Sequence, residues 1–238
     1  MASEHTAKAF DGDLQELTRL VAEMGGLVER MIVDSVDALI RRDVALGKRV
    51  VAADVEIDRL QHMIEERAVL TIARRQPMAV DLREIIATIR ISGDLERVGD
   101  LAKNIAKRAI KIHSEMHIPR ATIGLRSMHE SAAILLKDVL DAYAQRDAAR
   151  ARAVWTHDAD LDALEDSVFR DLLTFMMEDP RNISFCTHLL FVSKNIERIG
   201  DHATNIAETV VYVVTGETLP MDRPKGRTTI SEAPTTVV

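Results

Sequence analysis

The chain has 238 residues and a formal net charge of −7, with 47% hydrophobic, 29% charged and only 3% aromatic residues. This hydrophobic fraction excludes general disorder, and the scarcity of aromatic residues, glycine and proline argues against a sheet sandwich or barrel. The acidic balance disfavours a nucleic-acid partner, and the single cysteine, Cys186, excludes both an internal disulfide and a thiolate zinc cage.

The N-terminal residues 1–13 contain acids and no apolar core, so we do not expect a signal peptide. No segment approaches the roughly 18 uninterrupted apolar residues that a membrane span requires. The single cysteine also fits a reducing compartment.

The first half of the chain predicts three long helices. Apolar residues recur at alternating spacings of three and four over residues 14–38, 57–68 and 95–112, which places them on one face of each helix. Asp43 lies where a short turn would cap the following helix, and Pro77 interrupts the next connection because proline cannot continue a helix interior.

The second half repeats this plan. Residues 37–43 align with residues 141–147, and Gln76-Pro77 aligns with Asp179-Pro180. Residues 96–106 align with residues 197–207, and eight of these eleven pairs are identical. We therefore predict an all-α fold of two tandem three-helix bundles, related by an internal pseudo-twofold repeat.

The predicted domain boundaries follow from the repeat and from the prolines. The first three-helix unit spans residues 11–117 and the second spans residues 120–216, with Pro119 between them. Residues 217–238 contain proline and glycine without apolar periodicity, so we expect a flexible tail there.

The third predicted helix of each unit carries an acidic motif in the same register. A spacing of four places its polar side chains on one stripe of the helix, and we expect this stripe to face away from the apolar seam. The first acidic stripe consists of Glu96, Asp100 and Asn104, and the second of Glu197, Asp201 and Asn205.

The acidic stripes predict metal sites. Like charges four residues apart repel by a few tenths of a kcal/mol, and the intervening glycine costs about 1 kcal/mol relative to alanine. Carboxylate and amide oxygens suit a hard divalent or trivalent cation, such as magnesium, manganese, calcium or iron, which would offset the repulsion. The alternative is a solvated acidic face that was copied when the chain was duplicated.

Other candidate ligands carry weaker signals. Asp58, Glu65 and Asp162 could complete a metal site from a neighbouring helix, although they also suit a helix surface. His113 and His117 stand four residues apart, but their position at a helix end favours a solvent or dipole role.

The motifs of the chain resemble those of the PhoU family of phosphate-uptake regulators. The resemblance rests on residues 73–77, 81–83, 94–100 and 195–201, together with the duplicated three-helix plan. It implies two bundles side by side, with surface metal sites built on Glu/Asp-x-x-x-Asp motifs. It covers essentially the whole chain except the tail, which is not a general feature of the family.

The resemblance also implies a function without catalysis. A PhoU-like protein would be a homodimeric cytoplasmic adaptor between the ATPase of a phosphate-specific ABC transporter and a PhoR-type sensor histidine kinase. It would act as a negative regulator when phosphate is plentiful. Two alternatives remain open from the residues alone: a carboxylate-metal enzyme, which the absence of any Glu-x-x-His motif disfavours, and a protein that binds phosphate through metal.

Overall fold

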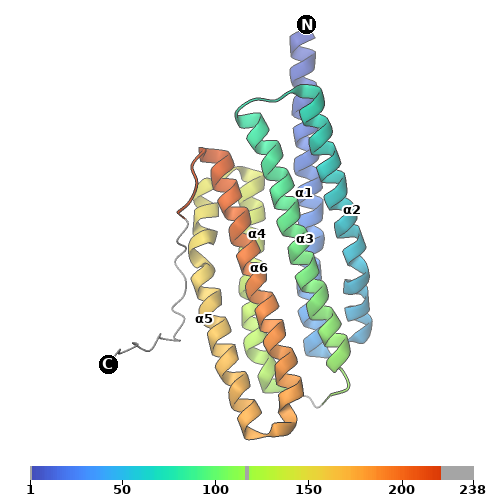
Figure 1. Ribbon diagram of the computed structural model, residues 1–238, viewed down its shortest axis with the longest axis vertical. Coiled ribbons are helices and arrows are strands. Elements are labelled where there is room, and N and C mark those ends of the chain that lie inside the picture. The colour runs from blue at the N-terminus through green and yellow to red at the C-terminus, as the bar shows by residue number, and fades with distance from the viewer. Residues whose placement is uncertain (1, 116–117, 221–238) are drawn as a thin grey trace, which may run out of the picture.

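The computed structural model describes residues 2–115 and 118–220, and for residues 2–9 and 158 it describes the backbone alone. In these ranges the chain forms six long helices and no strand (Figure 1), which confirms the predicted all-α fold. The helices are α1 (Ala2–Arg41), α2 (Val44–Arg75), α3 (Val80–Ile112), α4 (Ile123–Gln145), α5 (Ala148–Glu178) and α6 (Ile183–Thr215), with the short 3-10 helices η1 (Pro119–Thr122) and η2 (Pro180–Asn182).

The helices form two up-down-up bundles, α1–α3 and α4–α6, that lie side by side (Figure 1). Helix α1 starts at the same end of the molecule at which α6 ends (Figure 1). As a result, α3 and α6 run antiparallel where the bundles meet. This confirms the predicted tandem repeat of three-helix bundles.

The predicted apolar seams form the core. Met24, Leu60, Leu95, Leu161 and Ile196 are all fully buried. Burying one such side chain stabilises the fold by about 1.5–3 kcal/mol, so these seams decide which face of each helix turns inward.

The connections are specified by the residues that the sequence singled out. The Asp43 carboxylate accepts a hydrogen bond from the Leu46 amide (2.9 Å), and the Asp147 carboxylate accepts from Ala149 (2.9 Å) and Arg150 (3.0 Å). Both aspartates therefore cap the helices that follow them, as predicted.

Beyond α6, residues 217–220 are not helical, and the remainder of the predicted tail, residues 221–238, lies outside the described residues. Among the helices that the structure describes, none is both long enough and apolar enough to cross a membrane.

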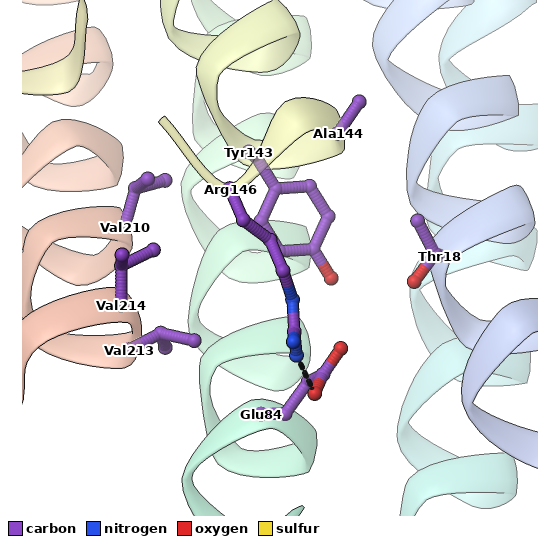
Figure 2. Close-up of a pocket in the computed structure, with 8 residues that line it drawn as sticks. All are labelled: Thr18, Glu84, Tyr143, Ala144, Arg146, Val210, Val213 and Val214. Carbon is purple, nitrogen blue, oxygen red and sulfur yellow. Dashed lines mark hydrogen bonds and ion pairs between the residues drawn. The ribbon is translucent and has the colours of Figure 1, made fainter. Parts of the chain in front are cut away.

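Polar side chains hold the two bundles together along α3. Asp94 of α3 contacts His202 of α6 (2.9 Å), and Thr88 of α3 shares a hydrogen bond with Tyr143 of α4 (3.1 Å). Near that tyrosine, Arg146 pairs with Glu84 across a small cavity that α1, α3, α4 and α6 enclose (Figure 2). The cavity is about 70 Å³, which leaves room for a few water molecules.

The helix caps give a test of the fold's energetics. Replacing Asp43 with alanine should lower the free energy of unfolding by about 1 kcal/mol, because the Leu46 amide loses its acceptor. Urea unfolding followed by circular dichroism measures the change. Asp43→Asn is the matched control, since asparagine caps as well as aspartate, and an equal loss in both variants would contradict the capping role.

Candidate metal centre

The first acidic stripe lies at the edge of the groove between α2 and α3 rather than on an open outer face. The Glu96 side chain is only 17% exposed, and that of Asp100 is 34% exposed. Gly99, between them, is buried, and a Cβ atom there would meet Ile57 of α2 at 3.3 Å. The motif glycine therefore allows close approach of a neighbouring helix, and the expectation of a fully outward stripe is corrected.

A lysine joins the two walls of this groove. Lys103 Nζ lies 2.6 Å from Asp54 Oδ2 on α2 and 2.5 Å from Asp100 Oδ1 on its own helix. Burial alone would lower the pKa of Lys103, but its hydrogen bonds to both carboxylates raise the pKa above its ordinary value. The ammonium is therefore firmly charged and neutralises part of the stripe.

Glu96 is affected by the remaining negative charge in the groove. Burial raises its pKa, Arg97 partly opposes this effect, and the charges of Asp100, Asp58 and Asp54 raise the pKa further. Four carboxylates from two adjacent helices thus influence one another, which is the electrostatic setting in which a bound cation is stabilising.

The second acidic stripe occupies the equivalent position on α6, where α6 packs on α5, and this contact is called the second groove. Glu197 is 17% exposed and its Oε1 accepts a hydrogen bond from the exposed Lys194 (2.8 Å). Burial raises the pKa of Glu197, the Lys194 ammonium lowers it, and Asp201 of the same helix and Asp162 of α5 raise it. Its second oxygen, Oε2, is buried without a hydrogen-bond partner in the part of the chain that the structure describes.

The two stripe asparagines have different surroundings. Asn104 is exposed, whereas Asn205 is half-buried and donates a hydrogen bond to Asp94 of α3 (3.3 Å). Asn205 therefore lies at the contact between the bundles, beside His202. Of the two weaker histidine candidates, His113 is exposed and His117 lies outside the described residues.

The side chains of the two acidic stripes are chemically suited to binding a hard cation. All of the candidate ligands are oxygen donors, and the unpartnered oxygen of Glu197 is a site that a metal ion would satisfy. Within the described residues, no three His, Cys, Asp or Glu side chains already converge on one point. Metal binding would therefore require the carboxylates of a groove to move together.

Two residues of the first groove were not predicted to take part in a site. Asp54 and Lys103 meet there, and neither belongs to the two predicted stripes. A signal was available, because Asp54 and Asp58 stand one helical turn apart, as Glu96 and Asp100 do. What the spacing could not show is that the two pairs face the same groove.

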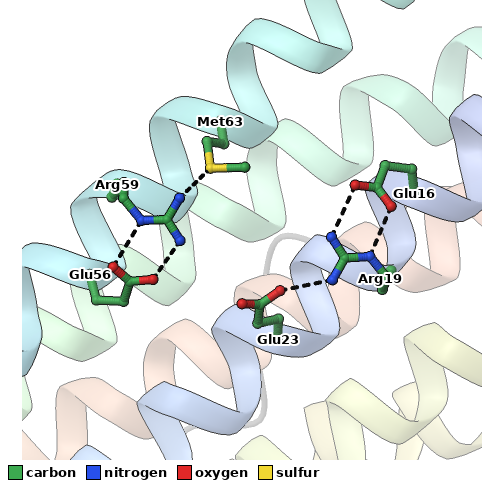
Figure 3. Close-up of polar contacts among 6 residues, drawn as sticks. All are labelled: Glu16, Arg19, Glu23, Glu56, Arg59 and Met63. Atoms are coloured by element: carbon green, nitrogen blue, oxygen red, sulfur yellow. Dashed lines mark hydrogen bonds and ion pairs between the residues drawn. The ribbon is translucent and has the colours of Figure 1, made fainter.

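Acidic pairs elsewhere on the surface differ from the stripes. On α1, Arg19 bonds to both Glu16 (2.8 Å) and Glu23 (3.0 Å), and on α2, Arg59 bonds to Glu56 (Figure 3). The hydrogen bond from Arg19 lowers the pKa of Glu16, which is the opposite of the shift at Glu197. The stripe glutamates also have basic neighbours, Arg97 at 3.4 Å from Glu96 and Lys194 at 2.8 Å from Glu197, but their side chains are more buried than those of Glu16 and Glu23.

Together these features define a class of protein: a doubled three-helix bundle with a carboxylate pair at matching positions in each half. The model of the PhoU domain matches the chain twice, over residues 21–109 and 125–210. The chain belongs to the PhoU family.

Relatives and solved structures agree with this assignment. The chain is 54% identical over 226 residues to a protein of Rhizobium meliloti named "Phosphate-specific transport system accessory protein PhoU homolog", covering 94% of this chain and 95% of that protein. A protein of the same name from Caulobacter vibrioides is 49% identical and matches 94% of this chain and 97% of its own length. The crystal structure of PhoU from Pseudomonas aeruginosa superposes with a TM-score of 0.84 at 40% identity, over 87% of this chain and all of that one.

These names describe accessory proteins and no enzyme family is indicated, in agreement with the prediction of a protein that is not an enzyme.

The raised pKa of Glu197 predicts a pH dependence of stability. The folded protein binds a proton at Glu197 more readily than the unfolded chain does, so this group's contribution to stability is greatest below pH 4.5 and is lost as the pH rises through its folded pKa. In metal-free protein, Glu197→Gln should therefore raise the unfolding midpoint at pH 7 and have less effect near pH 4. Thermal unfolding in a chelator at several pH values measures this.

The matched control is Glu16→Gln, because the pKa of Glu16 is lowered rather than raised. This variant should not be stabilised at pH 7. If Glu197→Gln instead destabilises the protein at pH 7, burial of the ionised Glu197 carboxylate does not lower the stability of the folded protein.

Proposed function

We propose that the protein is a cytoplasmic accessory regulator of a phosphate transport system. The observation that carries this proposal is the match, over 94% of the chain, to relatives that are named accessory proteins of the phosphate-specific transport system. The architecture is compatible with it, because a stiff helical platform offers long surfaces for binding other proteins. No nucleic acid is among its expected partners, since the chain has a net charge of −7.

The proposed partners are the ATPase of a phosphate-specific ABC transporter and a PhoR-type sensor histidine kinase. As an adaptor and negative regulator, the protein would restrain both when phosphate is plentiful. It needs only to bind one state of the kinase more tightly than the other. A difference in binding free energy of about 1–3 kcal/mol shifts the equilibrium between the two kinase states 5- to 150-fold. Contact with the membrane would then come through the transporter and the kinase.

The proposed cofactor is a divalent or trivalent metal ion at each acidic stripe. Two features support it: the mutual repulsion of half-buried carboxylates in each groove, and the unpartnered oxygen of Glu197. Oxygen ligands admit magnesium, manganese, calcium or iron. Glu96 with Asp100 and Glu197 with Asp201 are the central ligands of the proposal, and Asn104 and Asn205 extend the stripes.

We further propose a homodimer, on the basis of an exposed apolar surface near the η2 turn. Phe169, Leu173 and Met177 follow one another at single-turn spacing on α5 and are 42%, 38% and 78% exposed. Ile183, at the start of α6, is 49% exposed. Apolar side chains aligned on one helix face are typical of a surface that another protein covers.

The metal and the regulatory role are tested together by replacing Glu96, Asp100, Glu197 and Asp201 with alanine. Elemental analysis of the purified protein should show bound metal in the native protein and none in the variant. Affinity capture from cells grown with ample phosphate should recover the transporter ATPase and the sensor kinase with the native protein and recover less of both with the variant.

The matched control replaces Glu16 and Glu23, which both pair with Arg19 on the surface of α1. This control should retain both metal and partners. Equal metal content in the native and four-alanine proteins would reject the metal sites. Failure of the native protein to recover either partner would reject the adaptor role.

The dimer is tested by Leu173→Glu, which places a charge in the centre of the apolar row on α5. Light scattering coupled to size-exclusion chromatography should give twice the chain mass of 26.5 kDa for the native protein and a single chain mass for the variant. Val33→Glu, at a similarly exposed apolar position on α1, is the control and should remain dimeric. A native protein that elutes as a monomer at micromolar concentration would reject the dimer.

A further inference from the structure

The two grooves are neutralised in different ways. In the first groove, the ammonium of Lys103 bridges carboxylates of two helices, Asp54 on α2 and Asp100 on α3, at 2.6 Å and 2.5 Å. The Lys103 side chain is only 19% exposed and that of Asp54 only 12% exposed. A charged hydrogen bond with little solvent contact is stronger than an exposed surface ion pair.

The second groove has no lysine at the matching position. The repeat places Thr204 where the first unit has Lys103, and the Thr204 hydroxyl is buried and donates to the Gly200 carbonyl (2.9 Å). A lysine does pair with the second acidic stripe, but it is Lys194, which lies one turn before Glu197 and whose side chain is 56% exposed. It bonds to one Glu197 oxygen and leaves the other buried without a partner among the described residues.

We propose that Lys103 is a built-in counter-ion that competes with metal for the first groove, so that the two metal sites of the protein differ in affinity. This inference rests on the proposed metal sites and adds to them a residue that sets their order of filling. Metal enters the second groove first, and it enters the first groove only by displacing the Lys103 ammonium.

The competition follows from the positions of the atoms. A hard divalent cation binds carboxylate oxygens at about 2.0–2.6 Å, and Lys103 Nζ already lies 2.5–2.6 Å from an oxygen on each wall of the groove. Asp100 is the residue that both cations would use, so the ammonium and a metal ion would compete for its carboxylate. Two cations at that carboxylate would also repel each other, so the lysine must leave before the metal binds.

Displacement of Lys103 has a structural consequence as well. Its bond to Asp54 links the side chains of α2 and α3, and displacement of the ammonium would break that link. Metal binding in the first groove therefore costs an existing ion pair, whereas in the second groove it would give a partner to a Glu197 oxygen that has none among the described residues.

The test isolates each groove in the full-length protein. Glu197→Gln with Asp201→Asn leaves only the first groove, and Glu96→Gln with Asp100→Asn leaves only the second. Calorimetric titration with manganese(II) should show tighter binding in the protein that retains the second groove. Adding Lys103→Met to the protein that retains the first groove should then strengthen manganese binding at least tenfold.

Lys107→Met is the matched control, because Lys107 is an exposed lysine one turn further along α3. It removes the same charge from the same helix and should change the affinity less than threefold. If Lys103→Met does not fold, Lys103→Gln serves instead, since it removes the charge and keeps a hydrogen-bond donor. A second readout is thermal unfolding, in which Lys103→Met should lower the midpoint without metal and manganese should restore it.

The outcomes separate this inference from the proposal on which it rests. If neither isolated groove nor the native protein binds manganese, the metal sites themselves fail and the role of Lys103 fails with them. If manganese binds but Lys103→Met leaves the affinity unchanged, weakens it or matches Lys107→Met, the metal sites stand and the competition by Lys103 is overturned.

Discussion

The constraint on which the rest of this structure depends is the placement of partly buried carboxylates where two helices pack together. Close packing of α3 on α2 is made possible by Gly99, and it removes Glu96 from most of its contact with water. A half-buried carboxylate that has acidic neighbours is costly unless a cation accompanies it. In the first groove Arg97 pairs with Glu96, and Lys103 pairs with Asp54 and Asp100. In the second groove one oxygen of Glu197 is buried without a hydrogen-bond partner among the described residues.

Much of the fold could be predicted from the sequence because its signals are local or periodic. The spacing of apolar residues identifies the buried face of each helix, Asp43 and Asp147 identify the helix starts, and the repeated Glu-Arg-Val/Ile-Gly-Asp motif identifies the duplication. Each of these signals acts within one helix or one turn, so the chain order alone is sufficient to read it.

The site could be predicted only in part, because its geometry depends on which helices become neighbours. The spacing of Glu96 and Asp100 shows that they share a helix face, but their exposure is decided by how closely α2 approaches. The role of Lys103 was missed for the same reason, since its partner Asp54 lies 49 residues away along the chain. Asn205 extends the stripe on a helical wheel, yet in the structure its amide serves the contact with α3.

Helix α3 contacts both α2 and α6 at almost the same position along its axis. Asp94 points to His202 and Asn205 of α6, while Glu96, two residues later, lies in the groove with α2. Two residues along a helix correspond to only about 3 Å of axial rise. Because both residues stand on one helix, a rotation of α3 that moved Glu96 would also move Asp94 and alter its contacts with His202 and Asn205 of α6.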